Sequence, residues 1–434
     1  MKRQATKYLE QWKSNSNRKP LIIRGARQVG KTWLMKEFGN KHYKNIAYVN
    51  FEDSVTLQNL FVENFDINRI LLAVEIETGI KIDHLNTLII FDEIQEAERG
   101  ITALKYFYEQ TPQYHVVAAG SFLGVTLHKN TSFPVGKVDF LDLHPMNFPE
   151  FIEASGNTQL LELLHQKDWN LIKIFKNRYI ELLKQYYFTG GMPEAVSEFF
   201  KNKDLTEVRN IQKRILFGYE QDFSKHAPTS TVPRIRMLWN SIPAQLSKEN
   251  KKFIYSAIKK SARAKEFESS ISWLGDSGLV YKVHRITKPG IPLKAYEDFG
   301  AFKLFISDVG LLAAMSDLPA RSIMNGNSVF EEFKGALTEQ YVLQQLRTLT
   351  NNDIFYWSAD NARAEIDFIV QNEDMILPIE VKAAENLKSK SLKVFSQKYP
   401  ETKPVRISMS DFRKESWLTN LPLYAVSEIF SIHA

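Results

Sequence analysis

One eight-residue segment, GARQVGKT at positions 25–32, has the composition of a phosphate-binding loop. Its two glycines let the backbone curl so that successive N–H groups point at phosphate oxygens. Lys31 is expected to reach the β- and γ-phosphate oxygens of ATP, and the Thr32 hydroxyl to bind Mg²⁺. The predicted nucleotide-binding residues are Gly25, Ala26, Arg27, Gln28, Val29, Gly30, Lys31 and Thr32.

Two adjacent carboxylates, Asp92 and Glu93, follow the apolar run Leu88–Phe91. We predict that Asp92 holds Mg²⁺, usually through water, and that Glu93 orients and deprotonates the attacking water. Two acids alone could be a solvated strand end, but a complete Gly-rich loop upstream favours the catalytic interpretation. Ser121, just after the run His115–Ala119, is a candidate contact for the γ-phosphate or the water, although a plain turn serine explains it almost as well.

No residue stands out as the arginine finger that stabilises charge during phosphoryl transfer. Arg27, Arg99 and Lys137 are near enough in the sequence to be considered. Each is equally well explained as a solvated basic side chain. The sequence therefore predicts ATP binding more firmly than it predicts turnover.

A second set of chemically suggestive residues lies near the C-terminus: Glu339, Asp367, Glu380 and Lys382. The order Glu, Asp, Glu-x-Lys is that of PD-(D/E)xK nucleases, in which carboxylates gather Mg²⁺ on the scissile phosphate. Since side chains alternate along a strand, Glu380 and Lys382 should share one face. A solvated face with a modest salt bridge is the alternative, because Glu-x-Lys is a common tripeptide.

Short apolar runs alternate with amphipathic stretches between residues 20 and 140, which predicts βαβ units on a parallel sheet. A polar helix is expected at 1–18 and another helix at the start of Thr32–Phe38, with its positive end towards the phosphates. The predicted strands are Leu21–Ile23, Ile46–Phe51, Leu88–Phe91 and His115–Ala119, all nearly continuous in apolar residues, as buried parallel strands are.

The remainder of the chain divides into three further predicted regions. Residues 145–225 have helical spacing, interrupted by a turn at Gly190–Pro193. Short helices followed by the runs Leu279–Ile286 and Leu293–Tyr296 form a winged-helix pattern. A helix at Phe330–Leu349 then leads into strands at 354–357, 365–370 and 375–381. The predicted domains are an ATPase (1–145), a helical connector (146–228), a winged helix (229–320) and an α/β nuclease-like domain (321–434).

The winged-helix pattern raises the question of DNA. The candidate recognition helix, Ala264–Ser277, buries Phe267, Ile271 and Leu274 and presents acidic or neutral residues, where a groove reader usually has Arg, Lys, Asn or Gln. The residues expected to be exposed on it are Glu266, Glu268, Ser269, Ser270 and Ser272. Basic residues cluster elsewhere and form either a phosphate-contacting patch or a solvated face: Lys248, Lys251, Lys252, Lys259, Lys260, Arg263 and Lys265.

Composition limits the possible locations and chemistries. The 434 residues contain no cysteine, which excludes disulfides, thiolate metal sites and cysteine nucleophiles. The N-terminus lacks the apolar segment of a signal peptide, and no apolar run reaches the roughly 18 residues of a membrane helix. We expect a cytoplasmic protein that has no membrane among its partners. The net charge of +6 permits a polyanion partner without requiring one.

The motifs resemble those of prokaryotic AAA+ P-loop ATPases that carry a C-terminal PD-(D/E)xK nuclease-like domain of unknown function. The matching segments are GARQVGKT, Ile89–Gln95, Ala118–Gly124, Phe133–Phe151, Tyr187–Val196, Tyr356–Val370 and Leu377–Glu385, so the resemblance covers nearly the whole chain. Lys137 stands where an arginine is expected, and Phe122 follows Ser121 where a second serine is usual. Both differences weaken the expectation of turnover and leave that of ATP binding intact.

Together these features predict an α/β protein that binds Mg²⁺-ATP and couples its hydrolysis to rearrangement of the winged-helix and nuclease-like regions, with DNA as a candidate substrate. The alternative is a nucleotide-dependent switch that binds protein partners and has an inactive nuclease-like domain. A third interpretation is a nuclease that the ATPase only gates. The sequence leaves the oligomeric state open.

Overall fold

The chain folds into two compact units, as seen in a computed structural model that describes residues 1–121, 123–126, 134–248, 251–325, 328–359, 364–383 and 388–432. The first unit comprises Met1–His144 together with Asp276–Leu279, and the second comprises Pro145–Gly275 and Val280–Ala434. The predicted ATPase region therefore coincides closely with the first unit. The connector, winged-helix and nuclease-like regions remain predicted divisions inside the second.

The first unit contains a five-stranded sheet in the order β2-β3-β4-β1-β5, with every pairing parallel. The four predicted strands are confirmed, and β5 is an additional strand that the sequence did not reveal. Its elements are α1 (Ala5–Ser14), β1 (Leu21–Arg24), α2 (Lys31–His42), β2 (Asn45–Asn50), α3 (Ile67–Thr78), β3 (Thr87–Asp92), α4 (Gly100–Gln110), β4 (His115–Ala119), α5 (Leu123–Thr126) and β5 (Asp139–Asp142), with short 3₁₀ turns at Val55–Leu57 and Ile94–Glu96.

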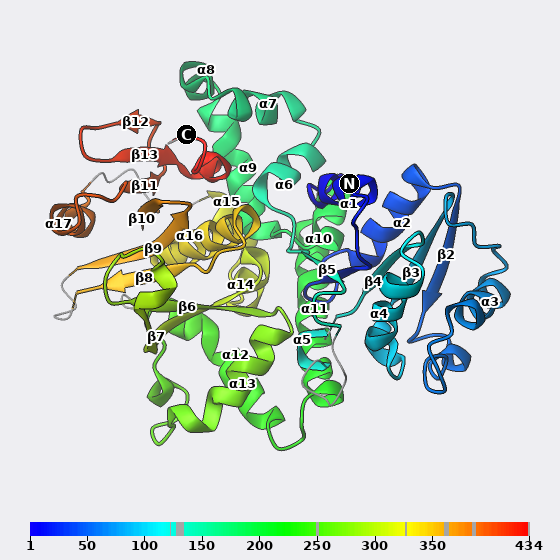
Figure 1. Ribbon diagram of the computed structural model, residues 1–434. Coiled ribbons are helices and arrows are strands. Elements are labelled where there is room, and N and C mark those ends of the chain that lie inside the picture. Colours follow the sequence, from blue (N-terminus) through cyan, green and yellow to red (C-terminus); the bar gives the residue numbers. More distant parts are fainter. Residues whose placement is uncertain are drawn as a thin grey trace. The chain divides into compact units, whose positions relative to one another are not determined.

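Helices cover both faces of this sheet (Figure 1). Right-handed crossovers place α2 on one face and both α3 and α4 on the other. The packing agrees, since α1 contacts α2 and α3 contacts α4. All residues of β3 and of β4 are buried, which explains their continuous apolar sequences.

The second unit combines a helical region with an eight-stranded sheet in the order β12-β13-β11-β10-β9-β8-β6-β7. Its helices are α6 (Phe148–Ala154), α7 (Thr158–Gln166), α8 (Trp169–Ile174), α9 (Lys176–Thr189), α10 (Pro193–Asn202), α11 (Leu205–His226), α12 (Val232–Leu246), α13 (Ala264–Asp276), α14 (Val309–Met315), α15 (Ala320–Asn325), α16 (Ser328–Leu349) and α17 (Lys390–Lys398). Its strands are β6 (Val280–Ile286), β7 (Glu297–Ile306), β8 (Phe355–Ser358), β9 (Glu365–Asn372), β10 (Met375–Val381), β11 (Val405–Ser408), β12 (Arg413–Lys414) and β13 (Thr419–Pro422), and 3₁₀ turns lie at Tyr255–Ala257, Leu293–Tyr296 and Leu423–Glu428.

The hairpin of the predicted winged helix differs from the expectation in two ways. The run Leu293–Tyr296 is a 3₁₀ turn rather than a strand, and β7 begins only at Glu297. The Tyr296 carbonyl accepts a hydrogen bond from the N–H of Thr287, which follows β6. Strand β6 also pairs in parallel with β8. The hairpin β6–β7 is therefore the edge of the large sheet rather than an isolated pair of strands.

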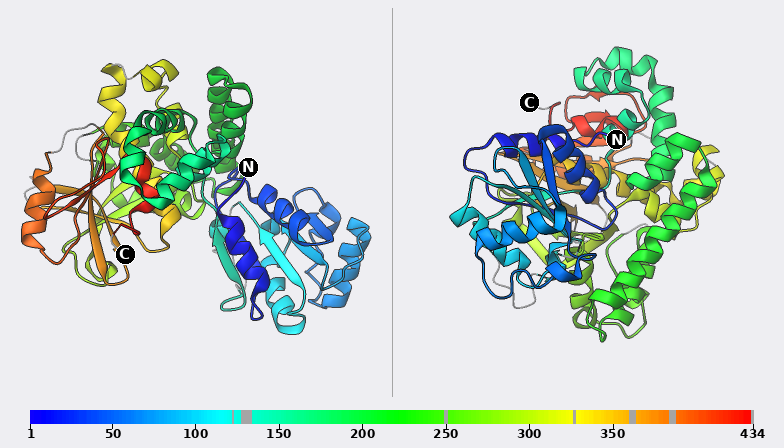
Figure 2. Two further views of the ribbon diagram at one scale, coloured as in Figure 1. Left: turned by 90° about the horizontal axis from the view of Figure 1, so that it is seen from above. Right: turned by 90° about the vertical axis from the view of Figure 1, so that its right-hand side faces the viewer.

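Two helices flank the middle of this sheet. Helix α17 contacts β9 and β10, as the orange helix beside the strands in Figure 2 also shows, and α16 contacts β10. The α17 side is apolar, built from residues such as Trp357, Ile366 and Phe395. Because strands carry alternate side chains to opposite faces, the residues between these apolar positions can point away from this core.

The turn predicted at Gly190–Pro193 joins α9 to α10. Gly190 ends α9 with φ +71°, and Pro193 opens α10. The Gly191 N–H donates to the buried carboxylate of Asp308 over 2.6 Å. In the described part of the chain, no helix has both the length and the apolarity needed to cross a membrane.

A buried histidine at the start of β4 gives the first unit a testable pH dependence. Tyr43 Oη lies 2.5 Å from Nδ1 of His115, and burial, together with the charges of Arg18 and Lys13, lowers the pKa of His115 to about 4. In the unfolded chain this group takes up its proton near pH 6.5. The unfolded state therefore binds more protons below that pH, and stability is lost as the pH falls from 6.5 towards 4.

We expect the free energy of unfolding of the wild-type chain to fall by about 1–2 kcal/mol more between pH 7 and pH 5 than that of His115→Gln, which has no proton to gain in this range. Urea unfolding of both full-length proteins at the two pH values measures the difference. Equal pH dependences would contradict a neutral buried imidazole.

Candidate nucleotide site and carboxylate cluster

The loop between β1 and α2 has the backbone of an anion-binding nest. Gly25, Gln28 and Gly30 have φ values of +146°, +67° and +96°, which alternate with ordinary conformations and turn successive N–H groups inward. At Gly25 a Cβ atom would lie 2.2 Å from the Leu143 carbonyl oxygen, so only glycine fits there. Helix α2 begins at Lys31 and adds its positive end to the same place.

Lys31 is drawn into this loop and is almost completely buried, with 5% of its surface exposed. Its Nζ donates to the carbonyl oxygens of Gly25 and Ala26, each over 2.9 Å. Burial lowers its pKa to about 8, although the nearby charges of Glu93 and Asp92 act in the opposite direction. A phosphate that enters the loop would supply the stronger acceptor that these two carbonyls now replace.

Thr32 and Asp92 meet directly, as the magnesium hypothesis requires. Thr32 Oγ1 donates to Asp92 Oδ2 over 2.6 Å, and Tyr48 Oη donates to the same oxygen over 3.1 Å. Burial raises the pKa of Asp92, which the hydrogen bonds from Thr32 and Tyr48 partly offset. A hydroxyl and a carboxylate oxygen side by side fit Mg²⁺, which is held by few protein oxygens together with nucleotide phosphates and water.

Glu93 is held in place by donors on two loops. The Ser121 Oγ and backbone N–H donate to its two oxygens over 3.0 and 3.2 Å, and Gln95 Nε2 donates over 2.6 Å. Its own backbone lies in the left-handed region, with φ +49°, which is uncommon for a residue other than glycine. Since β4 lies between β1 and β3 in the sheet, Ser121 just beyond its carboxyl end is close enough to hydrogen-bond to Glu93 after β3.

The three finger candidates are all occupied elsewhere in the first unit. Lys137 precedes β5, whose first residue pairs with the beginning of β1, so it lies at the sheet edge opposite the loop, and it forms an ion pair with Glu109. Arg99 donates to the Val62 carbonyl. Arg27 lies 3.8 Å from Glu52.

The sequence analysis did not identify three residues of the nucleotide site. Tyr48 donates one hydrogen bond to Asp92, and Gln95 donates one to Glu93. Neither residue belongs to a sequence motif that would have indicated this contact. Gly278 belongs to the Asp276–Leu279 segment of the first unit and has φ +73°. A Cβ atom there would lie 3.1 Å from the Ala26 nitrogen, so this chain segment packs directly on the phosphate-binding loop.

The structure also brings the predicted nuclease residues together in the second unit. Asp367 on β9 accepts a hydrogen bond from the Val381 N–H over 2.7 Å, and Lys382 pairs with Glu380 over 2.9 Å. Burial and the charge of Glu339 raise the pKa of Asp367 to about 7. Two lysines that the sequence did not associate with the cluster, Lys251 and Lys303, lie next to Glu339.

The predicted recognition helix has nearly the expected surface. On α13, Phe267, Ile271 and Leu274 are buried, and Glu266, Glu268, Ser269 and Ser272 are exposed. Ser270 is the exception, since it is completely buried. It lies on the same side of the helix as Phe267 and Leu274, three residues before and four residues after it. The basic residues Lys252, Lys259, Lys260, Arg263 and Lys265 are exposed.

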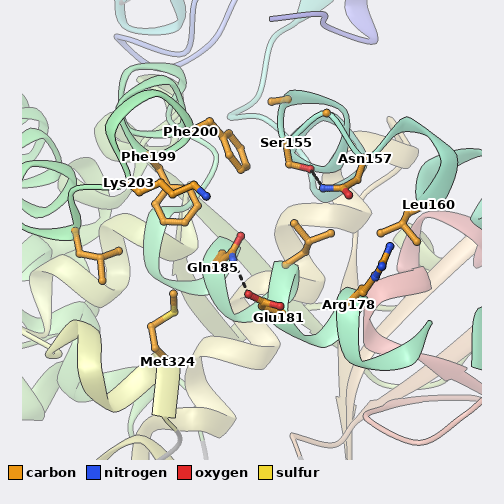
Figure 3. A pocket seen from close by; sticks show the side chains of 14 residues that line it. Ser155, Asn157, Leu160, Arg178, Glu181, Gln185, Phe199, Phe200, Lys203 and Met324 are labelled. Carbon is orange, nitrogen blue, oxygen red and sulfur yellow. Dashed lines mark hydrogen bonds between the residues drawn. The ribbon is translucent and has the colours of Figure 1, made fainter. Parts of the chain in front are cut away.

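A pocket of about 730 Å³ lies elsewhere in the second unit, among the α6–α7 turn, α9 and the α10–α11 turn (Figure 3). Its lining mixes Phe199 and Phe200 with Arg178, Glu181 and Lys203. Cations, an anion and aromatic rings together do not define one ligand. The pocket also contains none of the residues in which the sequence predicted chemistry.

The fold and site of the first unit define a nucleotide-binding P-loop domain, and comparison with known families specifies its type. Residues 17–152 match the family described as an AAA domain. The N-terminal part of the chain is therefore similar to AAA domains, the type of domain found in P-loop ATPases. Residues 180–322 and 334–425 match two domains of unknown function, DUF8612 and DUF4143.

Individual proteins are more distantly similar. An uncharacterized protein of Methanocaldococcus jannaschii is 22% identical over 407 residues, covering 88% of this chain and 79% of the relative. The Walker-type ATPase of Pyrococcus abyssi is 14% identical, covers 72% of this chain and 95% of its own, and has a TM-score of 0.45. Aquifex aeolicus DnaA bound to AMPPCP is 15% identical, covers 63% and 85%, and has a TM-score of 0.27. Scores this low do not establish a shared architecture for the whole chain, so the AAA-domain match carries the assignment.

Replacement of Lys31 by alanine tests the nucleotide site. Because Lys31 supplies a charge-assisted contact to the phosphates, we expect Lys31→Ala to weaken ATP binding by about 10- to 100-fold or more. Isothermal titration of ATP with Mg²⁺ into both proteins measures this. Lys41→Ala, which removes an exposed lysine from the other end of the same helix, should bind as the wild type does, and unchanged binding by Lys31→Ala would contradict the site.

Proposed function

We propose that the chain binds Mg²⁺-ATP at residues 25–32, hydrolyses it, and uses the nucleotide cycle to rearrange its second unit. The observation that carries this proposal is the direct contact of Thr32 with Asp92, with Glu93 oriented next to them by Ser121 and Gln95. The loop N–H groups and Lys31 bind the phosphates, and Thr32 and Asp92 hold the metal ion. Mg²⁺ would contribute charge neutralisation on the β- and γ-phosphate oxygens.

Hydrolysis further requires Glu93 to exchange one partner. In the present arrangement both of its oxygens accept hydrogen bonds, one of them from the Ser121 hydroxyl. To deprotonate a water molecule, one oxygen must turn towards that water. Ser121 would then bind the γ-phosphate or the water when it releases Glu93. A slow basal rate follows from this arrangement.

Glu93→Gln separates binding from hydrolysis. The amide keeps the size of the side chain but is not a base, so we expect unchanged ATP affinity and at least about a 100-fold lower hydrolysis rate. Phosphate release under saturating Mg²⁺-ATP, with and without DNA, provides the measurement. Hydrolysis at the wild-type rate would remove Glu93 from the proposed role, and a wild-type chain without ATP affinity would remove the function.

The second candidate function is a nucleotide-dependent switch that binds protein partners and whose nuclease-like domain cuts nothing. It is favoured by one observation, the pairing of the carboxylates with lysines: Glu339 with Lys251, and Glu380 with Lys382. A carboxylate already paired with an ammonium group is a weaker ligand for Mg²⁺. Both candidates share the ATPase unit and differ in what the second unit does.

A nicking assay on supercoiled DNA tests whether the nuclease-like domain cuts. We expect no Mg²⁺-dependent nicking by the wild-type chain. Nicking that disappears in Asp367→Ala would instead establish a metal-dependent nuclease, and nicking that survives unchanged in this variant would exclude Asp367 from it.

DNA contact itself is a separate part of the proposal and rests on the exposed basic residues at 252–265. If they bind phosphates, the affinity for DNA falls steeply with salt, because each contact releases a counterion. A fluorescence anisotropy titration at several salt concentrations gives this slope. A chain that binds only proteins shows no such binding.

A further inference from the structure

A fully buried ammonium group, Lys303, lies in the second unit and has no part in nucleotide binding. It is on β7, and none of its side chain is exposed. It forms an ion pair with Glu365 on β9, and its Nζ lies 3.8 Å from Oε2 of Glu339 on α16. The ring centre of Tyr356 is 5.0 Å away. A charge this deep persists only when opposite charges surround it.

Glu339 faces ammonium groups on both of its oxygens. Lys251 Nζ donates to Oε1 over 2.5 Å, and both side chains are about nine-tenths buried. Burial by itself raises the pKa of Glu339, but Lys251 and Lys303 outweigh it and leave the pKa lowered. Glu339 is thus an ionised carboxylate whose charge is already compensated.

The cluster as a whole is close to electrically balanced. Four carboxylates face three ammonium groups: Glu339, Glu365, Asp367 and Glu380 face Lys251, Lys303 and Lys382. A divalent metal ion would add two positive charges within a few ångströms of fixed ammonium groups, and the repulsion is strong in a poorly solvated site. Among the described residues, no three His, Cys, Asp or Glu side chains are arranged to hold a metal ion. The residues therefore do not fit the Mg²⁺ that their order in the sequence suggests.

We infer that Lys303 is a built-in counter-cation, which together with Lys251 takes the place beside Glu339 that a divalent metal ion would require. The carboxylate cluster is then a latent metal site that the chain keeps metal-free with its own lysines. This inference concerns the second unit alone and does not depend on ATP hydrolysis. It also identifies what removal of Lys303 would uncover, since Oε2 of Glu339 and Oε2 of Glu380 are buried and accept no hydrogen bond within the described chain.

The test is a titration of the full-length, nucleotide-free chain with Mn²⁺, in which electron paramagnetic resonance measures the concentration of the free ion. We expect the wild type to show no binding that depends on the cluster, so that Glu339→Gln leaves its titration unchanged. Lys303→Met should gain a Mn²⁺ site, and the double variant Lys303→Met/Glu339→Gln should lose it again. Lys282→Met, which removes an exposed lysine from the neighbouring strand β6, is the matched control and should gain nothing.

Two results would overturn the inference: wild-type Mn²⁺ binding that Glu339→Gln abolishes, or a folded Lys303→Met chain that gains no site. Loss of the buried partner destabilises the single variant, so stability provides a second measure. Removal of both charges should leave the double variant more stable than Lys303→Met alone, because it no longer buries an uncompensated carboxylate. A double variant that is no more stable than the single one would also refute the pairing.

Discussion

Lys31 carries an ammonium group that is buried away from water. The residues of the candidate nucleotide site offset the free-energy cost of this desolvation. Desolvating a cation is expensive unless hydrogen-bond acceptors and opposite charges replace the water. Two loop carbonyls accept its hydrogen bonds, and Asp92 and Glu93 supply the opposite charge. Their positions follow from the sheet, because the carboxyl ends of parallel strands lie along one edge. The loop and Ser121 follow strands that end there, and Asp92 is the last residue of β3.

The second unit solves the same problem in another way. Lys303 is more deeply buried than Lys31 and has no hydrogen-bonded carbonyls around it in the described chain; its compensation comes from the carboxylates of β9 and α16. At the nucleotide site the lysine can exchange its weak carbonyl partners for a phosphate. In the carboxylate cluster it already has strong partners, and exchange would leave a buried negative charge. In the two proposals, Lys31 therefore binds a phosphate, whereas Lys303 occupies the place of a metal ion.

This contrast explains why the two sets of carboxylates deserve different interpretations although both look catalytic. Asp92 accepts a hydrogen bond from a neutral hydroxyl, Thr32, while Lys31 directs its hydrogen bonds to two loop carbonyls, so we propose that Asp92 can still bind a metal ion. Glu339 meets two ammonium groups, so we propose that it cannot. A carboxylate's position in a motif says little until the charge next to it is known.

By itself the sequence determined the elements whose signals are local. These are the glycines of the loop, the apolar strands 21–23, 88–91 and 115–119, and the acids Asp92 and Glu93 after the second of these strands. Backbone freedom selects the glycines, and burial on both faces of a sheet selects the apolar runs. Both signals lie in residues that are close in the chain. Tertiary structure alone decided the rest. The contact of Tyr48 with Asp92, the approach of Gly278 to Ala26 and the burial of Lys303 against Glu339 all join segments far apart in the chain. No periodicity encodes such contacts, because packing of whole elements sets which charges face one another.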